Sequence, residues 1–311
     1  MIKGSLVPNI TLFDGDGTID HEKTTWHMRW MFERGVDGLF LTGSYGAGPL
    51  MSIAERVSIY QDARRVADAT AGARVVLAHV GAIDTGATIE LAKEAERVGV
   101  DGVAAVPPFY YKHSDAVILQ FYRDLIDAVD VPVYAYNNPA TSRYTFSLPV
   151  VRELASYGLR GLKDSPLNVG FLSSVVYENR IQGGNLEIIL GTSTGWLPLH
   201  HMGIDAAIAG MNNWAPEVMT ELFAATFAQD WSRAEKAYIV MLDLSRKMHF
   251  TDSTIASHMG LYARGFDGGY PRKPMLLPAS DDPNYGTIRA WIEDGFKALG
   301  LPFTTGSFVA R

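Results

Sequence analysis

The stretch RVVLAHVGAIDTGATIELAKEAERVGVDGVAAVPP, residues 74–108, predicts a strand, a helix and a second strand in succession. Its two ends, RVVLAHV at 74–80 and GVAAVPP at 102–108, are short apolar runs that barely alternate, as expected for parallel strands covered on both faces. Between them, apolar residues repeat at helical spacing over 85–98. The stretch therefore predicts a strand–helix–strand unit of the kind that builds parallel sheets.

The same pattern recurs along the chain, and it predicts the fold. Eight apolar runs, each followed by a longer amphipathic stretch, occur at 5–11, 38–43, 74–80, 102–108, 131–137, 159–165, 186–192 and 206–211. Eight strand–helix units of this length favour a closed TIM (β/α)₈ barrel. A doubly wound parallel sheet is the alternative, but no GxGxxG follows the first apolar run.

The strand pattern stops near residue 225, and only helical patterns follow. They cover 229–248, 252–264 and 286–299. We therefore expect a barrel carrying the active site over 1–225 and a C-terminal helical extension, packed on the barrel, over 226–311. No low-complexity linker separates the two parts.

The composition is that of a soluble protein with a substantial core, and it excludes several kinds of chemistry. Of 311 residues, 47% are hydrophobic and 20% charged, and the formal net charge is −7. An acidic surface repels phosphate backbones, so we expect no nucleic-acid partner. The absence of cysteine excludes disulfides, thiolate nucleophiles and zinc–thiolate or iron–sulfur sites. With no signal-like N-terminus and no bilayer-length apolar run, we expect a cytoplasmic protein without a membrane partner.

Polar residues at the C-terminal ends of the predicted strands are the candidates for catalysis, because TIM barrels carry their active sites there. Lys163 interrupts the apolar run 159–165, where its ammonium group loses hydration and its pKa falls. A neutral amine in a dry barrel can attack a ketone and form a Schiff base. The alternative is a lysine whose head reaches water or pairs with Asp164.

Other strand ends fit the same chemistry. Tyr136 ends the neighbouring run, so its phenol is expected to reach the space around Lys163 and to transfer protons. A tyrosine packed at the barrel rim is the alternative. The turn GSYG at 43–46 offers backbone N–H groups to a carboxylate, although such runs are also ordinary turns. For His79, at the end of the third run, a satisfied core histidine is favoured over a pocket residue.

Five stretches of the chain match one known family. They are LTGSYGAGPLMSIAER at 41–56, PPFYYKHS at 107–114, VYAYNNPATS at 133–142, GLKDSP at 161–166 and GTSTGWLP at 191–198. On these stretches, and over essentially its full length, the chain resembles the dihydrodipicolinate synthase/N-acetylneuraminate lyase superfamily. The resemblance implies a TIM barrel, class I lysine chemistry on a small 2-oxo acid, and a homo-oligomer, either a tetramer or a dimer.

Carried over by position, the resemblance implies a role for each matching residue. Lys163 would be the Schiff-base lysine and Tyr136 the proton-transfer tyrosine, with Ser44 relaying protons to it. Tyr110 would be the tyrosine lent across a subunit interface, and the backbone N–H groups of Ser44 and Tyr45 would hold the substrate carboxylate. The iminium is itself the electron sink, so we expect neither a metal nor a cofactor.

Three positions depart from the family pattern. Tyr45 stands where the family usually has a second small hydroxyl residue, so only its backbone role is carried over. Ala47 replaces the usual acidic residue. Thr141 stands where the diaminopimelate-pathway enzymes carry an arginine that grips a dicarboxylate, and the role of the nearby Arg143 is left open.

These features favour aldol cleavage or dehydration of a 2-keto-3-deoxy sugar acid. A polar lining would contact the substrate: Thr141, Ser142, Thr192, Ser193 and Asn212. The alternative within the family is 4-hydroxy-tetrahydrodipicolinate synthase, which joins pyruvate to aspartate semialdehyde. A barrel that binds 2-oxo acids without catalysis is a further alternative, and the presence of both Lys163 and Tyr136 argues against it.

A different class of enzyme matches one further motif. TLFDGDGT at 11–18 contains the DxDGT signature of haloacid-dehalogenase-like phosphatases, with Asp14 as nucleophile, Asp16 as acid/base and Mg²⁺ as cofactor. The alternative is a polar β-turn that leads into a helix. Because the phosphatase needs a doubly wound sheet and further metal ligands, the β-turn is the favoured interpretation.

Overall fold

The computed structural model describes residues 1–306, in which eight parallel strands close into a barrel in chain order. The strands are β1 (Gly4–Pro8), β2 (Gly38–Leu41), β3 (Val75–His79), β4 (Gly102–Ala105), β5 (Val133–Asn137), β6 (Gly161–Asp164), β7 (Glu187–Leu190) and β8 (Ala206–Ile208). Each lies within or beside one of the apolar runs. The predicted TIM barrel is therefore confirmed.

Helices follow the strands in the predicted alternation. Those of the strand–helix units are α1 (His21–Glu33), α2 (Ile53–Ala69), α3 (Thr85–Val98), α4 (Asp115–Ala128), α6 (Leu148–Tyr157), α7 (Val169–Ile181), α8 (Trp196–His200) and α9 (Pro216–Phe227). Short helical turns are η1 (Gly48–Leu50), α5 (Pro139–Ser142), η2 (Ser193–Gly195), η3 (Gly210–Asn213) and η4 (Met248–Phe250). The last helices are α10 (Trp231–Lys247), α11 (Ser253–Ala263) and α12 (Asn284–Leu299), which agree with the three predicted helical segments. The domain boundary near residue 225 stays a prediction.

Local chemistry sets the ends of these elements. The carboxylate of Asp84 accepts the Ala87 N–H at 2.9 Å and begins α3, and Gly99 ends that helix in the left-handed conformation. The apolar run at 102–108 is longer than β4, because Pro107 and Pro108 have no N–H to continue the ladder. The strands are thus shorter than their apolar runs, and the loops that carry polar residues begin earlier.

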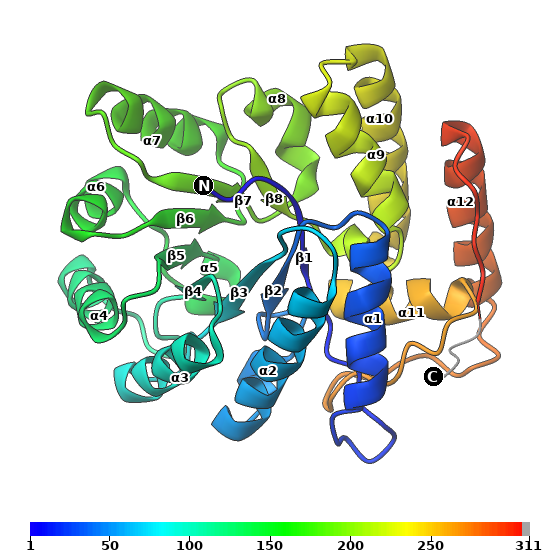
Figure 1. Ribbon diagram of the computed structural model, residues 1–311, viewed down its shortest axis with the longest axis horizontal. Helices are drawn as coiled ribbons and strands as arrows, with labels where there is room; N and C mark the ends of the chain where they lie inside the picture. Colours follow the sequence, from blue (N-terminus) through cyan, green and yellow to red (C-terminus); the bar gives the residue numbers. More distant parts are fainter. Residues whose placement is uncertain (307–311) are drawn as a thin grey trace. The chain divides into compact units, whose positions relative to one another are not determined.

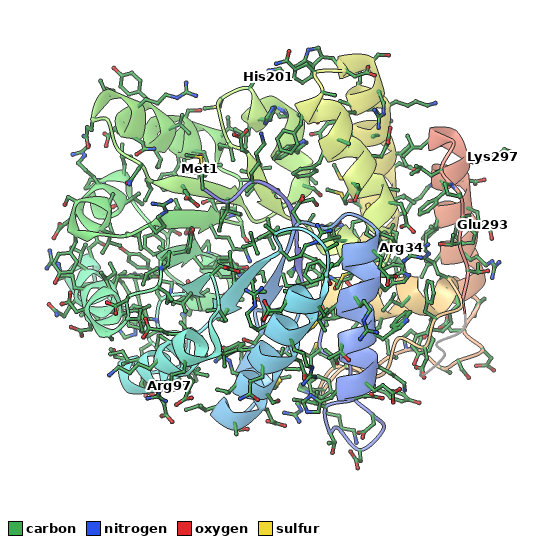
Figure 2. The ribbon with its side chains drawn as sticks, viewed as in Figure 1. Met1, Arg34, Arg97, His201, Glu293 and Lys297 are labelled. Carbon is green, nitrogen blue, oxygen red and sulfur yellow. The ribbon has the colours of Figure 1, made fainter. Side chains whose placement is uncertain are left out.

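The described chain forms two compact units, and the first contains most of the strands. It comprises Met1–Gly4, Ser52–Arg64 and Val75–Ile208. Consecutive strands pair in parallel from β3 to β8. Figure 1 shows α3, α4, α6 and α7 on the outer side of these strands, and Figure 2 shows Arg97 of α3 pointing away from them. The polar faces of these helices are therefore turned to solvent.

The second unit contains the first two strands and the last helices. It comprises Ser5–Met51, Arg65–Arg74 and the residues from Ala209 onward. β1 pairs in parallel with β2. Helices α9 and α10 pack side by side, and α12 packs against α10 and α11 (Figure 1). Across residues 1–306, none of the helices has the length and apolar character that a membrane crossing requires.

Candidate active site

Lys163 lies on β6 in a fully buried strand. Its side chain is 3% exposed, so the amine does not reach bulk water, and burial lowers the pKa of Lys163 well below the usual value of a lysine. Successive strand residues point to opposite faces, and the neighbouring Asp164 carboxylate accepts the Asn137 amide N–H at 2.6 Å and the Leu167 backbone N–H at 2.9 Å. These contacts favour the reactive-amine interpretation over a solvated lysine or one paired with Asp164.

Tyr136 lies directly beside this amine. It stands opposite Lys163 in the register of β5 and β6, and the Lys163 Nζ is 3.8 Å from the centroid of the Tyr136 ring. A ring face favours the protonated amine by about 0.5–2 kcal/mol and so acts against the effect of burial. The predicted meeting of these two side chains is therefore found.

The hydroxyl of Tyr136 has two polar neighbours that the sequence analysis missed. The amide Nδ2 of Asn138 donates to it at 3.2 Å, and the Oγ of Ser165 lies 3.4 Å away. Both follow from the two-residue period of a strand, since Asn138 is two residues beyond Tyr136 and Ser165 two beyond Lys163. Reading the pair of strands together on that period would have found them.

His79 supports the ring of Tyr136 from β3. The two rings meet edge to face at 5.9 Å, and His79 is buried. Its Nε2 accepts the Val106 N–H at 3.3 Å, while its carbonyl accepts a bond from Arg56 and one from the Tyr60 hydroxyl at 2.8 Å. His79 is thus a satisfied core histidine, as favoured, and it also forms one wall around Tyr136.

The loops after β4 and β5 hold two strained residues. Tyr110 has a φ of 85° and a side chain 70% exposed, and its ring meets that of Tyr111 edge to face. Arg143 has a φ of 58° and is also exposed. Non-glycine residues held in this conformation cost of order 1–3 kcal/mol and cluster at functional sites. A role for Tyr110 or Arg143 in the candidate site stays a prediction.

The predicted polar lining of the first unit is engaged in local hydrogen bonds. The hydroxyls of Thr141 and Ser142 donate to the Asn138 carbonyl at 3.1 and 3.0 Å and so close α5. Thr192 accepts the Thr194 N–H at 3.4 Å and begins η2, and the buried Ser193 follows it. Substrate contact by these hydroxyls stays a prediction.

In the second unit, the GSYG turn is folded tightly on itself. A Cβ on Gly46 would lie 2.9 Å from the Asn9 carbonyl oxygen, and one on Gly48 only 1.8 Å from that of Thr42. Thr42 itself is left-handed, with a φ of 50°. The glycines are required because the backbone passes so closely here, and the turn leaves the Ser44 side chain exposed.

Tyr45 and Asn212 have side chains directed at other parts of the same unit. A Cβ on Gly210 would meet the Tyr45 Oη at 2.3 Å, so the phenol lies against the start of η3, beside an 80 Å³ cavity lined partly by Trp214. The Asn212 amide donates to the Ser5 Oγ at 2.8 Å and to the Leu6 carbonyl at 2.9 Å. For Tyr45, contact between the backbone N–H and a substrate carboxylate stays a prediction.

The aspartates of the phosphatase motif form a polar turn. Asp14 and Asp16 each accept the Thr18 N–H at 2.9 Å. The closed barrel is not the doubly wound sheet that such a phosphatase needs, so this alternative is wrong. Within residues 1–306, no group of three or more His, Cys, Asp or Glu side chains is arranged to hold a metal ion.

Comparisons with known proteins agree with this geometry. A sequence model of the dihydrodipicolinate synthetase family matches residues 1–290. A 2-dehydro-3-deoxy-D-gluconate/2-dehydro-3-deoxy-phosphogluconate aldolase of Thermoproteus tenax is 28% identical, covering 87% of this chain and 85% of the aldolase. A 4-hydroxy-tetrahydrodipicolinate synthase of Methanosarcina barkeri is 28% identical, covering 97% of this chain and 99% of the synthase. The crystal structure of an Escherichia coli K12 prophage protein of the dihydrodipicolinic acid synthase family, in complex with pyruvate, matches with a TM-score of 0.83 and 25% identity over 97% of this chain and 100% of that one.

Proposed function

Because this chain belongs to the dihydrodipicolinate synthetase family, we propose that it is a class I lyase in which Lys163 forms a Schiff base with a small 2-oxo acid. Relatives in this family include the aldolase of Thermoproteus tenax and the synthase of Methanosarcina barkeri. The observation that carries the proposal is the burial of the Lys163 amine beside Tyr136, because burial lowers the pKa of this amine and so favours the neutral form that acts as a nucleophile.

The proposed reaction begins at the carbonyl C2 of the substrate. The Nζ of Lys163 attacks C2 to give a carbinolamine. The Tyr136 phenol protonates the hydroxyl of this carbinolamine, which leaves as water, so that a protonated iminium and the Tyr136 phenolate remain. In aldol cleavage the C3–C4 bond breaks, and its electron pair moves into the iminium to form an enamine. The C4 hydroxyl loses its proton to the Tyr136 phenolate as C4 becomes an aldehyde. Protonation of the enamine at C3 and hydrolysis then release pyruvate and regenerate the amine.

We assign the remaining roles by position in the family motifs. Ser44 would relay protons to Tyr136, and the backbone N–H groups of Ser44 and Tyr45 would hold the substrate carboxylate. The tight turn around Gly46 supports the second role, because it fixes the direction of these N–H groups before a ligand arrives. Substrate contacts by Thr141, Thr192 and Asn212 are proposed with them.

Tyr110 would act in a homo-oligomer, either a tetramer or a dimer. Its 70% exposure and left-handed backbone support a side chain presented outward, to be completed by another copy of the chain. Sedimentation of the purified protein should show a dimer or larger. A monomer with full activity would contradict the exchange of Tyr110.

The central proposal is tested by trapping the Schiff base. Incubation with pyruvate and borohydride should add one reduced pyruvyl group per chain, and peptide mapping should place it on Lys163. Lys163→Ala should remain unmodified, whereas Lys112→Ala, which removes an exposed lysine of the β4 loop, should still be labelled. EDTA should not prevent labelling. An unchanged mass of the wild-type protein would end the class I proposal.

For the substrate we propose a 2-keto-3-deoxy sugar acid. Thr141 offers one neutral hydroxyl where a second carboxylate would need a bidentate arginine, and losing a charged hydrogen bond costs about 1.5–3 kcal/mol, or roughly ten- to a hundredfold in rate. The test compares kcat/KM for 2-keto-3-deoxy aldonates with that for pyruvate plus aspartate semialdehyde. If the semialdehyde is preferred and Arg143→Ala abolishes that activity, then Arg143 replaces the missing arginine and the synthase is the correct assignment.

A further inference from the structure

Asn138 holds the hydroxyl of Tyr136 from the end of the same strand. Its amide Nδ2 donates to the Tyr136 Oη at 3.2 Å. Asn138 is half-buried, and Tyr136 is only 6% exposed. Water therefore competes weakly for the phenol oxygen, and a single donor has a large share in stabilising any charge that forms on it.

The backbone of Asn138 is fixed before any substrate binds. Its carbonyl accepts the N–H groups of Thr141 and Ser142 at 3.1 and 3.0 Å, as well as both of their hydroxyls. Pro139 follows it at the first position of α5. The amide is thus attached to a rigid turn, and little conformational entropy is lost when it bonds to Tyr136.

From this geometry we propose that Asn138 is a positioning residue that donates to Tyr136 and stabilises the phenolate formed when this tyrosine gives up its proton. The inference rests on the proposed function, in which Tyr136 transfers protons. An N–H donor favours the charged form of its acceptor, because the phenolate oxygen accepts more strongly than the neutral phenol. Asn138 would therefore lower the pH at which Tyr136 can act as a base.

Lys163, His79 and Ser165 also contact Tyr136, and each acts on it in a different way from Asn138. Lys163 lies over the ring face and is itself converted into the iminium, and His79 meets the ring edge with its Nε2 accepting from Val106. The Ser165 hydroxyl is able to donate or accept, so it adjusts to either state of the phenol. At Asn138 the donor can be replaced by an acceptor of the same shape, which is aspartate. Asparagine lowers the pKa of Tyr136, whereas aspartate at the same position would raise it.

Two variants with the same branching as asparagine separate hydrogen-bond donation from packing. Asn138→Leu removes the donor, and Asn138→Asp replaces it with an acceptor that carries negative charge. We expect the pKa of Tyr136 to rise by about 0.5–1 unit in the leucine variant, the equivalent of one neutral hydrogen bond, and by more in the aspartate variant. Thr141→Val is the matched control for the titration of the free protein alone, because it loses a bond to the Asn138 carbonyl and leaves the amide in place.

The experiment titrates the free protein labelled with ¹³Cζ-tyrosine, with Tyr136→Phe identifying the resonance of Tyr136. The proposal is supported if the pKa of Tyr136 is lowest in the wild type and Thr141→Val, higher in Asn138→Leu and highest in Asn138→Asp. Equal pKa values in all four proteins, or equal shifts in the two Asn138 variants, would overturn it. The pH profile of deuterium exchange at C3 of pyruvate should move by the same amounts. Borohydride trapping tests the proposed function separately. If trapping fails in the wild type, the Schiff-base proposal fails, and the titration still reports whether Asn138 donates to Tyr136.

Discussion

Two of the buried basic side chains, Lys163 in the first unit and Arg264 in the second, have opposite surroundings. Arg264 is fully buried, and its guanidinium donates to both carboxylate oxygens of Glu217 at 2.9 and 2.8 Å and to the Trp214 carbonyl at 2.9 Å. The Lys163 amine lies over the Tyr136 ring, and burial lowers its pKa. A bidentate carboxylate stabilises a buried cation, whereas burial by itself favours the neutral form of a base.

The largest expected effect comes from removing the amine of Lys163 while keeping its volume. Lys163→Met should lose the borohydride-trapped adduct and all turnover above background, because no other group takes the place of the nucleophile. Its free energy of unfolding should equal or exceed that of the wild type, since a buried amine is replaced by an apolar side chain of similar size. Mass spectrometry and chemical denaturation measure the two. If Lys163→Met is markedly less stable than the wild type, then the Lys163 amine stabilises the fold, and the contrast with the structural Arg264 is wrong.

The next largest effect should come from the tyrosine beside the amine. Tyr136→Phe keeps the ring that faces Lys163 and His79 but removes the hydroxyl, so kcat should fall by roughly 10²–10⁴, the usual worth of a positioned acid or base. The adduct with pyruvate should still be trapped, only more slowly. Steady-state rates and the time course of trapping distinguish these steps, and an unchanged kcat would remove Tyr136 from the proton transfer.

The fold was predictable from the sequence because its signal is repeated. Eight apolar runs separated by amphipathic stretches leave few other arrangements, and one such unit, 74–108, already has the strand–helix–strand order. Strand ends were less predictable. The Val-Pro-Pro at 106–108 is apolar enough to extend β4, but proline cannot continue the ladder.

The sequence predicted which side chains of the candidate site meet where two neighbouring strands pair, and predicted less about side-chain directions in the loops. Tyr136 and Lys163 end neighbouring strands, so their meeting follows from topology. The direction of the Tyr45 phenol depends on the absence of a side chain at Gly210, 165 positions away, and no local pattern contains that information. Similarly, no local pattern indicates that the amide of Asn212 donates to Ser5 and Leu6 of β1.

Arg264 provides the third prediction, which is the counterpart of Lys163→Met. Arg264→Met should lower the free energy of unfolding by roughly 3 kcal/mol, because the Glu217 carboxylate loses its bidentate partner and is left with the ion pair to Arg34, at 3.0 Å. Arg289→Met is the matched control, since its ion pair with Glu293 is exposed and worth under about 1 kcal/mol. Urea denaturation measures both. If Arg264→Met and Arg289→Met lose the same free energy of unfolding, then the buried ion pair of Arg264 contributes no more to stability than the exposed one of Arg289.

The smallest effect concerns two buried histidines of the second unit, which share with Lys163 a pKa lowered by burial. His27 contacts the Asn213 carbonyl at 2.8 Å and His258 that of Gly268 at 2.7 Å, and burial lowers the pKa of each to about 4. Each neutral ring donates one N–H to a carbonyl, so the histidines are structural and give no reactive group. They share with Lys163 the direction of the pKa shift and differ from it in the groups that lie beside them.

The sign of the resulting pH dependence follows from proton counts. Between pH 6.5 and about 4 the unfolded chain protonates these histidines while the folded chain does not, so stability is greatest above pH 6.5 and is lost as the pH falls. The slope is at most about 1.4 kcal/mol per pH unit for each histidine. Free energies of unfolding at pH 7, 6 and 5 should therefore decline in the wild type and decline less in His27→Gln, with the exposed His249→Gln as control. If His27→Gln and wild type lose the same free energy over this range, His27 already carries its proton in the folded state, and burial in the second unit does not act on bases as it acts on Lys163.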